Sequence, residues 1–410
     1  MKKAFLSSII VTIASVVISI FFKTLATSLY TKELLALFFS AVDVVGLFML
    51  FFIGFRASMS VSYARGVSAT QILAVFRVFV IGVCFFGFVS SFLFLKYTGF
   101  FIDTTYLFLL FASFGFYAYF SNQLSMYRLY FDINATSLLE PLASLAWFCA
   151  FYYIFFTQSI DALFLSSIAG MSSVSLYIYF RKNRLHKEPP FTFYKLDPNI
   201  KIFIKNSMLG GAEFMFGLLI IYFATLFVGY KFSLELLGDF QVVVKSFFLY
   251  FIAIFVFPIV KFILPELSSL VAKKDFIAIK KLNIFAFRYS LASGGALFLL
   301  CLFLSTPVIS WLFGSEYISA ANALTALSAA IFFVCLNTYQ VALLKSLDKF
   351  FLSASVRAFG SFLFLLFVFA IFYAYPTLES VSVALTLSYA SMSVVSYYLV
   401  KKELKRSFEN

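Results

Sequence analysis

The chain has 410 residues, of which 63% are hydrophobic, 21% aromatic and 12% charged, and its formal net charge is +13. A water-soluble protein of this composition would lack the polar surface needed to cover its core, so the composition excludes a soluble fold and predicts a membrane protein. The basic residues lie in short, separated loops, which excludes a nucleic-acid-binding surface.

Long apolar stretches divide the chain into membrane-spanning segments. A helix needs about 20 mostly apolar residues to cross a hydrocarbon core of about 30 Å. The sequence therefore predicts an all-α polytopic membrane protein with about 12 transmembrane helices, the ninth of which Pro307 could divide. The predicted spans are 4–22, 34–55, 72–95, 104–126, 138–157, 160–180, 207–229, 240–264, 283–313, 321–344, 352–373 and 379–400.

The basic residues mark one side of the membrane. The loops on the side of the N-terminus hold 22 basic residues, whereas the opposite loops hold four, namely Lys23, Lys32, Lys96 and Lys231. Under the positive-inside rule both termini are cytoplasmic. We expect a multi-pass protein of the cytoplasmic (inner) membrane.

The chain also divides into two similar halves. A basic loop with three prolines separates six spans from six, which predicts an N-terminal lobe at 1–180, a cytoplasmic linker at 181–206, a C-terminal lobe at 207–400 and a cytoplasmic tail at 401–410. The segment 33–38 resembles 235–240, and 171–177 resembles 392–398. Parallel repeats of this kind predict a cavity between two lobes and transport by alternating access.

Ionisable residues within the spans are the candidates for function, because each is costly at membrane depth. The carboxylates Asp43, Glu213 and Glu140 are candidates for coupling to a proton or sodium ion. The embedded cations are Lys245, Lys261, Arg77, Arg288 and Arg357; all but Lys245 lie near the cytoplasmic ends of their spans and have the alternative of reaching the headgroups. The single histidine and the four cysteines show no metal-ligand spacing, and no phosphate loop or nucleophile elbow occurs, so we expect no metal, no cofactor and no enzymatic activity.

Two motifs in the second half resemble a known family. The run from Phe257 to Leu270 and the segment Trp311 to Tyr317 are similar to the corresponding segments of Wzx-type polysaccharide flippases, within the multidrug/oligosaccharidyl-lipid/polysaccharide (MOP) exporter superfamily. The resemblance implies transport of undecaprenyl-diphosphate-linked oligosaccharides for O-antigen, capsule or exopolysaccharide assembly, with the bilayer and other assembly proteins as partners. The diphosphate would then contact Lys245, Lys261, Arg56, Arg288 and Arg357.

Several alternatives stay open at this point. A MATE-type drug antiporter would carry a cation-binding acid in its first helix, which this chain lacks, although Glu213 is a possible replacement. A lipid II flippase is also compatible, whereas a major facilitator is disfavoured because no Gly-x-x-x-Asp-Arg signature follows Arg56. A multi-span polymerase or ligase would need a sizeable outer loop, and the predicted outer loops are short.

Overall fold

A computed structural model describes residues 2–49, 51–52, 55, 58–59, 62, 67–98, 103–126, 160–183, 198–257, 259, 263–347 and 349–408. Every secondary-structure element in these ranges is a helix. The chain divides into two compact units, one formed by residues 1–30 and 37–215 and the other by residues 31–36 and 216–410. The helices α2 (Lys32–Met49) and α9 (Pro198–Lys231) therefore contribute residues to both units.

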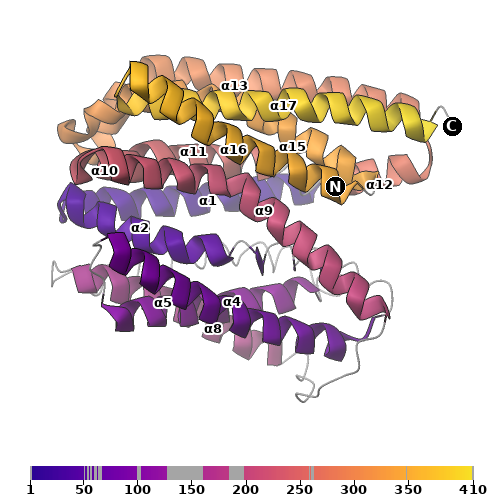
Figure 1. Ribbon diagram of the computed structural model, residues 1–410, viewed down its shortest axis with the longest axis horizontal. Helices are drawn as coiled ribbons and strands as arrows, with labels where there is room; N and C mark the ends of the chain where they lie inside the picture. The colour runs from indigo at the N-terminus through magenta and orange to yellow at the C-terminus, as the bar shows by residue number, and fades with distance from the viewer. Residues whose placement is uncertain are drawn as a thin grey trace. The chain divides into compact units, whose positions relative to one another are not determined.

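The first unit contains α1 (Lys2–Thr27), most of α2, α4 (Ala69–Thr98), α5 (Thr104–Met126), α8 (Ile160–Asn183) and the beginning of α9 (Figure 1). Helix α5 packs against both α4 and α8. Asp103 starts α5 as an N-cap, because its carboxylate accepts a hydrogen bond of 2.8 Å from the backbone N–H of Thr105.

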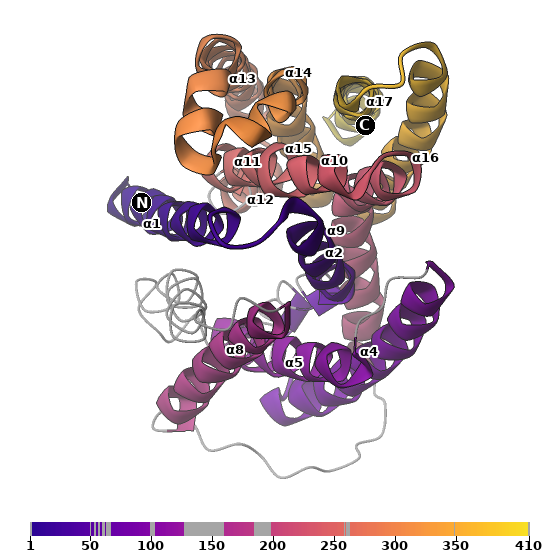
Figure 2. The same ribbon diagram turned by 90° about the vertical axis from the view of Figure 1, so that its left-hand side faces the viewer.

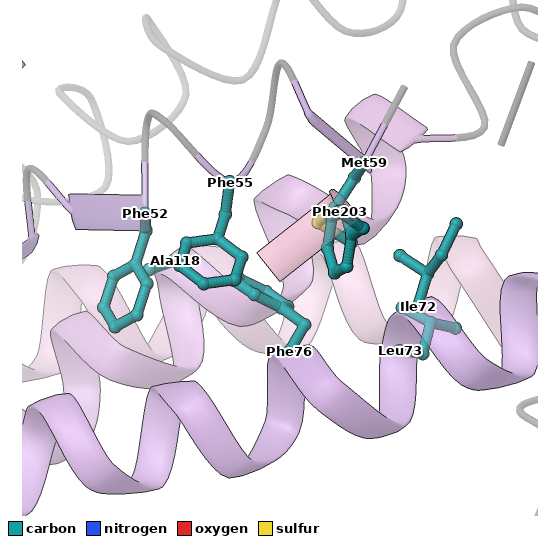
Figure 3. Packing of buried hydrophobic residues seen from close by; sticks show 8 residues of the cluster. All are labelled: Phe52, Phe55, Met59, Ile72, Leu73, Phe76, Ala118 and Phe203. Carbon is teal, nitrogen blue, oxygen red and sulfur yellow. The ribbon is translucent and has the colours of Figure 1, made fainter. Parts of the chain in front are cut away.

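Aromatic side chains form the core of the first unit (Figure 3). Phe76 of α4 is fully buried and contacts the rings of Phe52 and Phe55, and Phe55 also contacts Phe203 of α9. The side-chain amide of Asn122 donates a hydrogen bond of 2.7 Å to the backbone carbonyl of Phe52. This bond fixes α5 against the segment that follows α2.

The second unit begins with the end of α9 and a segmented span made of α10 (Leu234–Asp239), η3 (Phe240–Val244), α11 (Lys245–Phe251) and η4 (Ile252–Val256). The remaining helices are α12 (Leu264–Ala272), α13 (Phe276–Phe313), η6 (Ser315–Ala320), α14 (Ala321–Ser328), α15 (Ala330–Ser346), α16 (Phe350–Ala374) and α17 (Leu378–Phe408). Helix α15 packs against both α13 and α17, and α16 packs against α17 (Figure 2).

Two glycines let helices of the second unit approach closely. A Cβ at Gly294 of α13 would lie 2.6 Å from the backbone nitrogen of Phe332 in α15, and one at Gly360 of α16 would lie 2.3 Å from the sulfur of Met392 in α17. Small residues at such crossings are typical of helix packing in membranes. The outer face of α13 is apolar and exposed, as shown by Phe303 at 73% and Trp311 at 83% exposure, which suits contact with lipid.

Nine helices in the described part of the chain are long and apolar enough to cross a membrane. They confirm nine of the twelve predicted spans, and together they show a multi-pass membrane protein. Helices α1 and α2 occur at the first two predicted spans. Helix α2 is not among the nine, because its 18 residues include three charged side chains, Lys32, Glu33 and Asp43, and it is therefore less apolar. The predicted span 138–157 and most of the predicted linker lie outside the described residues, so both stay predictions.

Helix α13 corrects one expectation. The sequence allows Pro307 to divide the ninth span, but α13 continues through this proline to Phe313. Proline removes a single backbone donor, and neighbouring helices can hold the remainder of the helix together in a membrane bundle.

Candidate substrate site in the second unit

Lys245 occupies a distorted part of its span. It begins α11, and π-helical turns lie on both sides of that short helix, η3 immediately before Lys245 and η4 after Phe251. A π-turn inserts an extra residue, turns the following side chains to a new direction and is frequent at functional sites. The hydroxyl of Ser246 donates a hydrogen bond of 2.7 Å to the carbonyl of Gln241, five residues earlier.

The side chain of Lys245 is buried, with 4% of its surface exposed. Its ammonium donates a hydrogen bond of 3.2 Å to Oε1 of Gln241 and lies 5.0 Å from the ring centroid of Tyr222 in α9. The amide oxygen and the aromatic face both stabilise a positive charge. A cation held in this way at membrane depth is a candidate binding site for an anionic group.

A second cation, Arg357 of α16, lies in the same unit. Its side chain is half-buried, its guanidinium donates a hydrogen bond of 3.4 Å to Oγ1 of Thr338 in α15, and its Cδ lies 3.5 Å from the position of a Cβ on Gly217. Gly217 and Tyr222 are both on α9, and their spacing corresponds to about 7.5 Å along a helix axis. The two cations therefore contact neighbouring turns of one helix.

Three buried polar side chains of the second unit are bonded to one another. Asn337 of α15 donates a hydrogen bond of 3.0 Å to Ser396 of α17, and the hydroxyl of Ser396 donates in turn to Gln340. All three side chains are buried. Hydrogen-bonded polar groups between helices are the form in which a membrane protein tolerates polarity in its interior.

The structure places the other predicted residues in different environments. Asp43 of α2 is half-buried and Glu213 of α9 is buried at 5% exposure, and both belong to the first unit. Arg288 is exposed on α13. Lys261, Arg56 and Glu140 lie outside the described residues. Of the cations predicted to contact the diphosphate, Lys245 and Arg357 have side-chain contacts within the described part of the second unit.

Arg77, another cation of the predicted spans, has a local partner in the first unit. Its Nε donates a hydrogen bond to the hydroxyl of Tyr119, which connects α4 with α5. The bond gives Arg77 a structural role in the packing of these two helices.

Sequence reasoning missed an ion pair at the start of the second unit. Lys32, which the topology assigns to an outer loop, has its Nζ 2.7 Å from Oδ1 of the buried Asp239. Both residues fall in or next to the two repeated segments 33–38 and 235–240, and this repeat was the only signal in the sequence. The repeat indicates that the two segments begin equivalent helices, but it does not predict that Lys32 and Asp239 form an ion pair.

Among the described residues, no group of three or more histidine, cysteine or acidic side chains is arranged to hold a metal ion. The buried carboxylates described in the second unit, Asp239 and Glu403, pair with lysines. The other buried polar side chains described there are cations, amides and hydroxyls. Such groups bind anions and sugars without reacting with them.

No family model and no curated protein sequence matches the chain. Solved structures do match over nearly its whole length. An inward-facing MATE-family multidrug resistance transporter of the MOP superfamily has a TM-score of 0.77 at 13% identity, covering 98% of this chain and 99% of its own. A mutant of the Vibrio cholerae MATE transporter VcmN has a TM-score of 0.74 at 14% identity, covering 100% and 98%.

The lipid II flippase MurJ, in an inward closed conformation, matches with a TM-score of 0.71 at 14% identity, covering 97% of this chain and 89% of its own. The chain has the fold of MOP-superfamily transporters. At these identities the similarity shows the fold alone, which is the type of fold that the resemblance in the sequence motifs implied. The matching proteins are transporters and a flippase, which agrees with the expectation of a non-enzyme.

Proposed function

We propose that this protein moves undecaprenyl-diphosphate-linked oligosaccharides across the cytoplasmic membrane, from the inner to the outer leaflet, for assembly of a cell-surface polysaccharide. The observation that carries the proposal is the buried Lys245, held between two π-helical turns and supported by Gln241 and Tyr222. A diphosphate is the anionic part of such a substrate, and a compact ammonium suits it as a point-charge partner.

Arg357 is the proposed second contact for the diphosphate, and the polyprenyl tail would remain in lipid. Tyr222, Gln241 and Thr338 supply the aromatic face, amide and hydroxyl that sugar hydroxyl groups can contact. Lys261, Arg56 and Arg288 are proposed as additional cations along the path, and Asp43, Glu213 and Glu140 as the groups that bind a coupling proton or sodium ion.

Two observations favour this substrate over a cationic drug. Helix α1 contains no acidic residue, and the buried contacts described for Lys245 and Arg357 place positive charge inside the second unit. A positive site repels a cationic cargo and attracts an anionic one. A lipid II flippase is the second candidate, supported by the fold shared with MurJ, because lipid II also carries its sugars on a polyprenyl diphosphate.

The test is transport of a lectin-detectable undecaprenyl-diphosphate oligosaccharide in proteoliposomes. We compare the natural protein with Lys245→Ala, Lys245→Arg and Asp43→Asn. Lys245→Ala should lower the rate by at least about tenfold, as expected when a charged hydrogen bond to the substrate is lost, and Lys245→Arg should retain part of it.

Lys231→Ala is the matched control. Lys231 also lies against a tyrosine ring, 4.6 Å from the centroid of Tyr230, but it is exposed at the end of α9. Its removal should leave the rate unchanged. If the folded natural protein moves no lipid-linked sugar and instead exports small organic cations along an ion gradient, the assignment moves to the drug antiporters.

A further inference from the structure

Lys32 is fixed to the second unit by contacts to three different residues. Its ammonium pairs with the carboxylate of Asp239 at 2.7 Å, donates a hydrogen bond of 2.6 Å to the backbone carbonyl of Glu316 and lies 4.5 Å from the ring centroid of Tyr317. The hydroxyl of Ser319 donates to the other oxygen of the Asp239 carboxylate.

The local backbone is built for this close contact. A Cβ at Gly238 would lie 2.7 Å from the carbonyl oxygen of Lys32 and 2.9 Å from its Cβ, so only glycine allows α10 to come so near. Gly314 has a φ of +97°, a left-handed value that favours glycine, and it begins the turn that carries Glu316 and Tyr317. The Trp311 to Tyr317 segment thus has a structural role in presenting partners to Lys32.

The first turn of α2 belongs to a different compact unit from the rest of that helix. Residues 31–36 belong to the second unit, whereas the helix from Leu37 onward belongs to the first. Asp239 has 2% of its surface exposed and Lys32 has 16%. Opening this pair would leave a buried carboxylate without its cation, so the closed arrangement is strongly preferred until something offsets that loss.

We infer that the Lys32–Asp239 pair is a reversible latch: it holds the first turn of α2 on the second unit and has to open in each transport cycle. The inference rests on the proposed function in requiring transport, and in the predicted topology the latch lies at the outer side of the membrane. The Tyr317 ring and the carbonyl of Glu316 favour the closed state, because both contact the Lys32 ammonium when it is paired with Asp239.

The experiment replaces the ion pair by a reducible covalent link. Lys32→Cys and Asp239→Cys are combined in a chain whose four natural cysteines have been changed to alanine, and a short bifunctional methanethiosulfonate joins them. Transport is measured in proteoliposomes before and after reduction.

If the latch must open, the linked protein should transport at least about tenfold more slowly than the same protein after reduction. Each single-cysteine variant treated with the same reagents should be unaffected. Equal transport rates in the linked and reduced forms would overturn the inference. This holds whether both forms are active or both are inactive, because in neither case does opening the link restore transport.

The assay includes both a lipid-linked oligosaccharide and a small organic cation. Failure of the proposed substrate can then be distinguished from failure of the proposed latch. If the reduced protein carries only the cation, the proposed function fails, and the latch is still judged by the linked and reduced rates for that cargo.

Discussion

Lys32 and Asp239 are 207 residues apart in the chain, and their side chains form an ion pair of 2.7 Å. Removing one partner leaves the other charge with poor solvation, whereas removing both leaves no uncompensated charge. We expect Lys32→Ala and Asp239→Ala each to lower the unfolding free energy by about 2 kcal/mol, below the full range for a buried pair because Lys32 is partly exposed.

The double variant Lys32→Ala/Asp239→Ala should be less destabilised than the sum of the two single variants, by at least about 1 kcal/mol. The measurement is thermal or denaturant unfolding in detergent, without any substrate. Lys231→Ala, which removes an exposed lysine of the same unit, serves as the control. Strictly additive effects would mean that the two charges do not stabilise each other.

Gly294 and Gly295 are neighbours on α13 with opposite surroundings. A Cβ at position 294 would approach the backbone of Phe332 to 2.6 Å, whereas nothing lies within 4 Å of one at position 295. Gly294→Ala should therefore destabilise the protein by about 1 to 3 kcal/mol through overpacking between α13 and α15. Gly295→Ala should be neutral or stabilising by up to about 1 kcal/mol, because alanine favours the helix.

The yield of monodisperse protein after heating in detergent separates these two variants directly. Equal behaviour of the two would show that α13 and α15 do not pack closely at Gly294.

Ser396 connects α17 with two side chains of α15, since it accepts a hydrogen bond from Asn337 and donates one to Gln340. Ser396→Ala leaves both partners buried with one fewer hydrogen bond, which should lower stability by about 1 to 2 kcal/mol. Ser391→Ala is the control, because Ser391 is half-buried on the same helix and its hydroxyl donates to the carbonyl of Leu387 in its own turn. Unfolding midpoints measured side by side test this, and a larger loss for Ser391→Ala would contradict it.

Phe76 is a central ring of the first unit's core, in contact with Phe52 and Phe55 (Figure 3). It also stacks on Tyr119, with ring centroids 5.8 Å apart. Phe76→Ala should destabilise by about 3 to 5 kcal/mol, as a large cavity in a packed core does. Phe85 is on the same helix but is 70% exposed, so Phe85→Ala removes a lipid-facing ring and should have little effect. Comparable losses for the two would show that α4 is oriented differently.

The sequence by itself determined the membrane location and most of the helices. Apolar runs of sufficient length have few alternatives in a bilayer, because every backbone group must be satisfied within the helix. Nine predicted spans are found in the described residues, and the motifs at Phe257 to Leu270 and Trp311 to Tyr317 implied the fold that the solved structures share. Lys245 was identified as an embedded charge on the same basis.

Tertiary structure alone decided which of the embedded charges are enclosed. Lys245 and Arg288 both occur within apolar helices, yet Lys245 is buried against Gln241 and Tyr222 while Arg288 is exposed on α13. Helix periodicity does not predict this, since the span with Lys245 contains two π-turns that rotate its faces.

The Lys32–Asp239 pair is the clearest example of a contact that the sequence does not predict. The sequence contains both residues at repeated helix starts, but their pairing depends on the close approach allowed at Gly238 and on the left-handed turn at Gly314. Composition and hydropathy report how each segment interacts with its solvent. Contacts between segments distant in sequence depend on packing geometry, and only the folded chain fixes that geometry.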